Sequence, residues 1–278
     1  MKTRPAEPDH TPDADALDAE AEAEAGARPK YAVPAVEKAL DVLELLSAQA
    51  VPMTQAQLAR ALGREPSELF RMLGVLEARG YLRREDNGGY VLTLKLFELS
   101  RTHSPHEQLL RAAIAPMREL SEGVRQSCHL SVLHRDQLLV LTQVDAPTAI
   151  RLSVEAGSLH SAVDTLSGQV LLANAPEAER DALLSRRAEF LRRSAEERAA
   201  YLGMLARMAA DGWGYAENAS FIGGRDLSVP VGRAGGRTRA VLTIASLRAA
   251  HVADDDLFDL LPRLRQCAET IGRVAGIA

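Results

Sequence analysis

Apolar positions along residues 33–47 recur every three or four residues, including Val36, Leu40, Leu43 and Leu46. This spacing predicts a helix with one buried face. Its second residue is Pro34, whose missing N–H is tolerated in a first helical turn. The first structured element of the chain is therefore expected to be this helix.

Two shorter helices follow. Thr54 is a favourable N-cap for a helix that ends near residue 62, and Ser67 can cap another that runs to about Arg79. Residues 81–84 and 90–92 then alternate between apolar and polar side chains around an Asn-Gly pair, which is a strong hairpin signal. The spacing of the three helices and the hairpin predicts a winged helix-turn-helix domain at residues 31–93.

In such a domain the second helix of the motif enters the major groove of DNA. The exposed face of the 67–79 helix has small residues beside Arg71, a donor for guanine or phosphate, and Phe70, which can contact a thymine methyl. Arg83 and Arg84 stand where a wing meets phosphates. The residues predicted to contact double-stranded operator DNA are Gln55, Ser67, Glu68, Phe70, Arg71, Arg83, Arg84 and Asn87.

The predicted DNA-binding region has no net charge, because residues 31–103 contain nine Lys or Arg and nine Asp or Glu. Non-specific DNA affinity comes from neutralising phosphates. We therefore expect modest affinity for one copy and dimerisation for useful occupancy. The same neutrality leaves an alternative open, in which the chain is a small-molecule sensor or enzyme whose winged helix serves protein contacts.

The pattern of the remaining residues predicts a linker helix at 94–105 and a second domain at 106–278. Pro116 is expected to kink or break the first helix of that domain. The alternation of elements predicts an α+β fold with an antiparallel sheet flanked by helices. Strands are expected at 128–133, 138–144, 150–154, 226–231 and 239–245, and helices at 106–126, 163–174, 176–211 and 254–277.

Several segments, taken in order, resemble IclR-type transcriptional regulators. They include "FRMLGVLEARGYLRR", "NGGYVLT", "SCHLSVLHRDQLLVLTQVDAP" and "GSLHSAVDTLSGQVLLA". The resemblance extends from about residue 31 to the end of the chain. It implies a winged helix, a linker helix and a GAF-like effector domain, assembly into homodimers or homotetramers, and a response to small, usually acidic metabolites.

The family pattern also implies the position of an effector pocket. Helix N-termini favour anions, so we also expect Thr165 and Gly168, at the start of the 163–174 helix, to line this pocket. Asp164 is the expected N-cap of that helix. The pocket residues carried over from the family are His160, Leu166, Ser167, Asn218, Gly224, Asp226, Thr243 and Ala245. We predict that a small organic acid, most simply a carboxylic acid, binds here.

Asp226 departs from the family pattern, which often has a small residue or cysteine at this position. A buried carboxylate is costly unless it is paired. We expect it to accept hydrogen bonds from a hydroxylated or amine-bearing ligand, or to pair with Arg225 or Arg151.

Composition limits the remaining possibilities. The net charge is −5, and residues 1–30 account for −4 of it in an Ala-, Asp-, Glu- and Pro-rich tail that we expect to be disordered. Two cysteines are too few for a disulfide framework, and no apolar run could span a bilayer, so a cytoplasmic protein without a membrane partner is expected.

No enzyme motif is apparent. Cys128, His129 and His134 lie close in sequence, but alternate residues of a strand face opposite ways and no second cluster has ligand spacing. We therefore predict no catalytic residues, no metal and no cofactor.

Overall fold

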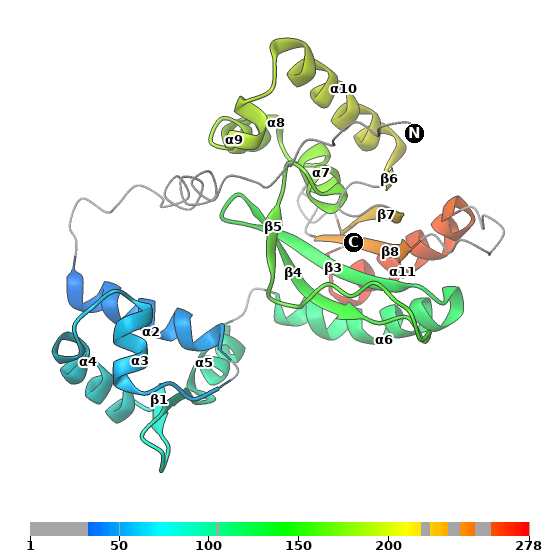
Figure 1. Ribbon diagram of the computed structural model, residues 1–278. Coiled ribbons are helices and arrows are strands. Elements are labelled where there is room, and N and C mark those ends of the chain that lie inside the picture. The colour runs from blue at the N-terminus through cyan, green and yellow to red at the C-terminus, as the bar shows by residue number, and fades with distance from the viewer. Residues whose placement is uncertain are drawn as a thin grey trace, which may run out of the picture. The chain divides into compact units, whose positions relative to one another are not determined.

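The computed structural model describes residues 33–49, 51–103, 106–217, 223–232, 240–247 and 257–277. The chain divides into two compact units between residues 103 and 104, each with its own hydrophobic core. Figure 1 shows the elements of both units. The acidic tail predicted at residues 1–30 lies outside the described residues.

The first unit is the predicted winged helix. Its strands pair antiparallel, and Met53 forms an isolated bridge to Tyr90. At the tip, Gly88 has a φ of +80° and the Asn87 side chain accepts a hydrogen bond from the Gly89 amide at 2.8 Å. The hairpin predicted from the Asn-Gly pair is therefore confirmed. The elements are α2 (Pro34–Ser47), α3 (Gln55–Ala61), α4 (Pro66–Ala78), β1 (Leu82–Arg84), β2 (Tyr90–Leu92) and α5 (Lys95–His103).

The two helices of the motif begin differently. Thr54 caps α3 as predicted, in a capping box where its amide donates to the Gln57 side chain at 2.8 Å. The prediction that Ser67 caps α4 is wrong, because Glu65 is the N-cap and Pro66 occupies the first turn. Proline has the φ that a first turn needs and lacks only an N–H that would find no helical partner there.

The core of the first unit lies between α2, α3, α4 and the hairpin. Leu58, Leu69 and Leu73 are fully buried in it, and Val42 is the buried centre of α2. Val36 and Leu40 were expected on the buried face of α2, but they are 54% and 51% exposed. The apolar stripe of α2 is therefore wider than the surface that covers it within this unit.

The second unit is built on a six-stranded antiparallel sheet with the order β5-β4-β3-β8-β7-β6. The predicted α+β class is confirmed. The strands are β3 (Ser127–His134), β4 (Gln137–Val144), β5 (Leu159–Ser161), β6 (Gly214–Glu217), β7 (Gly224–Val231) and β8 (Ala240–Leu247).

Helices cover both faces of the sheet (Figure 1). One face packs on α6 (Glu107–Val124) and α11 (Leu261–Val274) through residues such as Leu130, Leu242 and Ile244. α6 is not broken at Pro116, as its buried face packs along the sheet and offsets the lost hydrogen bond. The other face packs on α7 (Leu166–Ala173), and α10 (Ala195–Asp211) packs on α7. The helices α8 (Glu177–Leu184) and α9 (Ala188–Leu191) complete the core on this side.

Three predicted boundaries in this unit are wrong. Residues 150–154 are not a strand but part of a loop, because the Gln143 side chain accepts a hydrogen bond from the Val154 amide in place of a strand partner. α7 is capped by Thr165 rather than Asp164, which instead pairs with Arg193. The single helical stretch expected at 176–211 is three helices.

Candidate functional site

The exposed face of α4 combines an apolar and a cationic side chain. Phe70 is 67% exposed, and Arg71 beside it is exposed without an ion-pair partner among the described residues. Ser67, Gly74 and Ala78 on the same side are small and exposed. The face can therefore approach another surface closely, with one long donor available.

The neighbouring predicted contact residues have partners within the unit. Glu68 pairs with Lys38, whose ammonium group holds the pKa of that carboxyl below its usual value. The Gln55 amide donates to the Pro66 carbonyl at 2.7 Å, which fixes α3 against the start of α4. These side chains therefore position α4, the helix that carries Phe70 and Arg71.

The wing carries two arginines on β1, and Arg84 lies in the strand pair next to the turn. Arg83 lies 3.1 Å from Glu85, with its side chain 67% exposed. The Arg84 guanidinium lies 5.7 Å from the ring centre of Tyr90. Asn87 is exposed at the tip, where it closes the turn. The wing therefore presents cations on a rigid hairpin beside α4.

A cavity of about 290 Å³ lies in the second unit, between the sheet, the start of α7 and the 145–158 loop. Apolar side chains such as Leu138 and Val140 form part of its wall, and polar groups are interspersed among them. Small-molecule sites have this composition, with a few polar groups that orient the ligand. The cavity is therefore the candidate effector site.

A chain of buried polar groups supports the floor of the cavity. His129 Nε2 lies 3.3 Å from the Ser167 hydroxyl, which lies 2.8 Å from Thr243 Oγ1, and Thr243 in turn lies 2.7 Å from Ser228 Oγ. Burial lowers the pKa of His129 to about 4, and the nearby His160 adds to the shift. The imidazole of His129 is therefore neutral near pH 7 and ties α7 to the sheet.

Most of the residues carried over from the family pattern surround this cavity. Thr243 does not line the cavity itself but is hydrogen-bonded to Ser167, which does. Asn218 lies outside the described residues. Gly168 packs against the backbone of Ala162, and its amide donates to Thr165 Oγ1 at 3.3 Å. Those that line the cavity are His160, Leu166, Ser167, Gly224, Asp226 and Ala245, and Thr165, predicted from the helix start, lines it as well.

Sequence reasoning missed the loop that covers the cavity and the histidine beneath it. Leu152, Ser153 and Glu155 line the cavity from a segment that had been predicted to include a strand. His129 alternates with buried apolar residues along β3, and that polar position in an apolar strand was a usable signal. The loop had no comparable signal, because its place depends on side-chain bonds to Gln143 and Asp145.

Asp226 lies at the cavity wall on β7, where it pairs in register with Ala216 and Ala245. Burial raises the pKa of its carboxyl to about 6. Neither expected internal partner binds it: Arg151 pairs with Asp145 at 3.1 Å, and no salt bridge in the described part of the chain includes Asp226. Within the described part of the chain, this carboxyl therefore has no partner in the cavity wall.

Replacement of Asp226 by asparagine should stabilise the second unit at pH 8 and have little effect at pH 4. A carboxyl whose pKa rises on folding, from 3.8 to about 6, favours the folded state only below its unfolded pKa. Its contribution is lost as the pH rises through about 6, at a cost on the order of 1–3 kcal/mol. Urea unfolding at both pH values measures the difference.

The wild type must be compared with Asp226→Asn because titration of His129 changes stability in the opposite direction with pH. Its lowered pKa makes the wild-type chain lose stability as the pH falls from about 6.5 towards 4. The difference between the two chains removes this contribution. A difference that is the same at pH 4 and pH 8 would contradict the raised pKa of Asp226.

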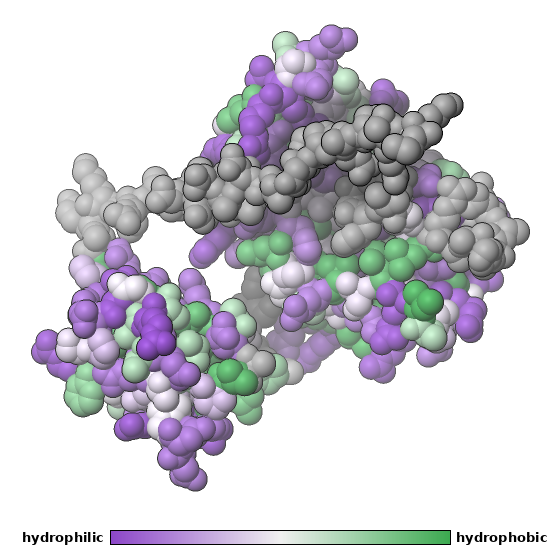
Figure 2. Space-filling model, in the orientation of Figure 1, coloured by the Kyte–Doolittle hydropathy of each residue, from purple (hydrophilic) through white to green (hydrophobic). Residues whose placement is uncertain are grey.

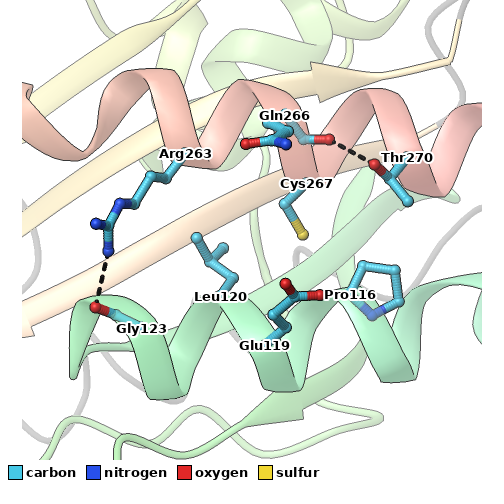
Figure 3. A pocket seen from close by; sticks show the side chains of 8 residues that line it. All are labelled: Pro116, Glu119, Leu120, Gly123, Arg263, Gln266, Cys267 and Thr270. Carbon is cyan, nitrogen blue, oxygen red and sulfur yellow. Dashed lines mark hydrogen bonds between the residues drawn. The ribbon is translucent and has the colours of Figure 1, made fainter.

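A second hollow of about 270 Å³ lies between α6 and α11, on the opposite face of the sheet (Figure 3). Two of its polar side chains are engaged within the protein: Arg263 donates to the Gly123 carbonyl at 2.9 Å, and Thr270 donates to the Gln266 carbonyl at 2.9 Å. Burial raises the pKa of Cys267 to about 12, so its thiol stays protonated. This hollow is a packing feature of two helices rather than a reactive site.

Comparison with known families agrees with this architecture. Residues 103–273 match the family described as bacterial transcriptional regulator IclR C-terminal, and residues 35–86 match the IclR helix-turn-helix domain. A helix-turn-helix domain followed by this C-terminal domain defines a class of transcriptional regulators with an effector domain. The chain belongs to the IclR family of bacterial transcriptional regulators.

Individual relatives cover most of the chain. The regulator XynR of Escherichia coli is 26% identical over 247 residues, which are 88% of this chain and 98% of XynR. KdgR of Dickeya chrysanthemi is 30% identical over 217 residues, which are 76% of this chain and 70% of KdgR.

Solved structures show the same fold. A transcriptional regulator from Rhodococcus has a TM-score of 0.72 at 25% identity and covers 88% of this chain and 99% of its own. An IclR homologue from Microbacterium hydrocarbonoxydans in complex with 4-hydroxybenzoate has a TM-score of 0.74 at 21% identity and covers 88% of this chain and all of its own.

No helix among the described residues is long and apolar enough to cross a membrane. No group of three or more His, Cys, Asp or Glu side chains among them is placed to hold a metal ion.

Proposed function

We propose that this chain binds operator DNA through its winged helix, and that a small carboxylic acid bound in the cavity beside α7 changes that binding. The observation that carries the proposal is the exposed face of α4, where an unpaired Arg71 stands beside Phe70 in the position that reads the major groove. Arg83 and Arg84 in the wing supply phosphate contacts.

Replacement of Arg71 by alanine should weaken binding to an operator selected from random duplex DNA by about 1–3 kcal/mol. The loss is expected because a bidentate guanine contact disappears while the helix keeps its buried face. Fluorescence anisotropy with labelled operator at fixed salt measures it.

Arg118→Ala is the matched control, because it removes an exposed arginine from α6 in the other unit. Equal affinities for the wild type, Arg71→Ala and Arg118→Ala would remove Arg71 from the DNA contact. Measuring the DNA affinity of the wild type at increasing salt concentration tests the alternative function. An affinity that falls steeply with salt indicates phosphate contacts. Binding that is absent or insensitive to salt favours a winged helix that serves protein contacts.

The effector assignment rests on the start of α7. The first amides of a helix have no partner within the helix and carry partial positive charge, which favours a carboxylate. Thr165, Leu166 and Ser167 bring this first turn to the cavity. The Microbacterium protein with the same fold was crystallised with a carboxylic acid, which supports this chemical class.

A regulator of this kind acts as an oligomer whose arrangement the ligand shifts. The first unit exposes apolar side chains that suit a second copy, including Val36 and Leu40 on α2 and Leu96, Phe97 and Leu99 on α5. Hydrophobic and hydrophilic residues are mixed on the visible face of this unit (Figure 2). Two-fold symmetry would match paired DNA half-sites, so a homodimer, or a homotetramer built from two, is the proposed state.

The remaining assignments follow from this function. Residues 31–93 are the DNA-binding domain, 94–105 the linker and 106–278 the effector domain. The chain works in the cytoplasm, where bacterial operators are found. Its relatives are transcriptional regulators, which supports a function without catalysis.

A further inference from the structure

The charges around the effector cavity do not suit a simple anion. Two carboxyl groups, those of Glu155 and Asp226, line it, and none of the described residues around it is a lysine or arginine. A ligand with only a carboxylate would place its negative charge near two others without a cation to balance them. The start of α7 can hold one carboxylate, but the rest of the wall favours positive charge.

Asp226 and Glu155 differ in their surroundings. Glu155 is exposed on the covering loop, where solvent screens its charge. Asp226 lies deeper, on a strand within the sheet, and its carboxyl has neither a hydrogen-bond donor nor a cation among the described residues. An unpaired carboxylate at such a depth destabilises the fold unless a ligand satisfies it.

We propose that the effector carries a protonated amine in addition to its carboxylate, and that the Asp226 carboxylate binds the amine. This inference rests on the proposed function, since it assigns the second end of the same ligand. The first turn of α7 and Asp226 line one cavity, so a single small molecule can contact both. The effector is then a zwitterionic amino acid in the broad chemical sense.

An ammonium group fits this wall better than a hydroxyl group does. A hydroxyl donates one hydrogen bond but leaves the negative charge of Asp226 uncompensated. An ammonium group donates a hydrogen bond to the Asp226 carboxylate and also neutralises its charge. Charge-assisted hydrogen bonds are about twice as strong as neutral ones. Asp226 therefore acts as a specificity-determining residue that selects amine-bearing acids against acids of the same shape.

The test uses trios of acids that differ in one terminal group. One trio is γ-aminobutyrate, γ-hydroxybutyrate and valerate, and another is p-(aminomethyl)benzoate, p-(hydroxymethyl)benzoate and p-ethylbenzoate. A wider set of small acids is arranged in the same way. Thermal shift on the full chain selects binders, and isothermal titration calorimetry measures their dissociation constants.

In trios that bind, the wild type should prefer the amine over the alkyl member by about tenfold or more. Asp226→Asn keeps the shape of the side chain and removes its charge, and it should abolish that preference. Glu122→Gln, which removes an exposed carboxyl from α6, should leave the preference unchanged.

The outcomes separate this inference from the proposed function. If hydroxyl or alkyl members bind the wild type as tightly as amines, or if Asp226→Asn keeps the amine preference, this inference is wrong and the carboxylic-acid effector stands. If no acid of any trio stabilises the wild type, the effector assignment fails and this inference fails with it.

Discussion

Replacement of Gly168 by alanine should destabilise the second unit by about 2–4 kcal/mol and abolish its effector response. A Cβ at this position would lie 2.3 Å from the carbonyl oxygen of Ala162 and 2.5 Å from its Cα. Both atoms belong to the backbone, so no side-chain rotation relieves the clash. α7 must move away from the turn that precedes it, and the displacement carries Leu166 and Ser167 away from the cavity.

Gly203→Ala is the matched control, because it also places a methyl group on a helix of the same unit. The nearest atom there is the end of the flexible Arg207 side chain, at 3.8 Å. Alanine should leave stability unchanged or raise it by about 0.5–1 kcal/mol through better helix propensity. Thermal unfolding of the three chains decides the matter: equal midpoints for wild type and Gly168→Ala would show that the close contact does not hold α7 in place.

Replacement of Leu73 by alanine should cost the winged helix about 3–5 kcal/mol and eliminate DNA binding. Leu73 is completely buried on the inner side of α4, in the same cluster as Val42, Leu58 and Leu69. A loss of this size is comparable with the total stability of a small domain. The DNA-contacting face on the outer side of the helix would then have no fixed support.

Val75→Ala tests whether the effect depends on burial. Val75 lies two residues further along α4 and is 61% exposed, so its truncation should change stability by about 0.5 kcal/mol or less. Urea unfolding followed by circular dichroism compares the two variants. If both lose the same stability, or if Leu73→Ala unfolds like the wild type, the core assigned to this unit is wrong.

The winged helix was predictable because its signals are local. Each signal depends only on residues close in sequence. Examples are the capping box at Thr54, the Asn-Gly hairpin tip and the buried positions Leu69 and Leu73. The class of the second unit was predictable for a similar reason, since Cys128, Leu130 and Val132 alternate with polar residues along most of β3. The apolar stripe of α2 is wider than the surface that covers it. Periodicity therefore could not show that Leu40 on this stripe is exposed.

The effector cavity was less accessible to sequence reasoning. The family resemblance indicated the start of α7 and the wall residue Asp226. The covering loop was mistaken for a strand because residues 150–154 are rich in apolar residues, whereas Gln143 and Asp145 determine its path through side-chain bonds. Such bonds join residues about ten positions apart and follow no period. Only the three-dimensional arrangement shows that no lysine or arginine among the described residues lines the cavity beside Asp226.

The central claim, that α4 reads a DNA sequence, is tested most directly by selecting binding sites from a random duplex library with the full chain. We predict enrichment of one motif with two related half-sites, and loss of that enrichment in Arg71→Ala. A pool that remains random after repeated selection at low salt, or the same motif recovered with Arg71→Ala, would contradict the claim.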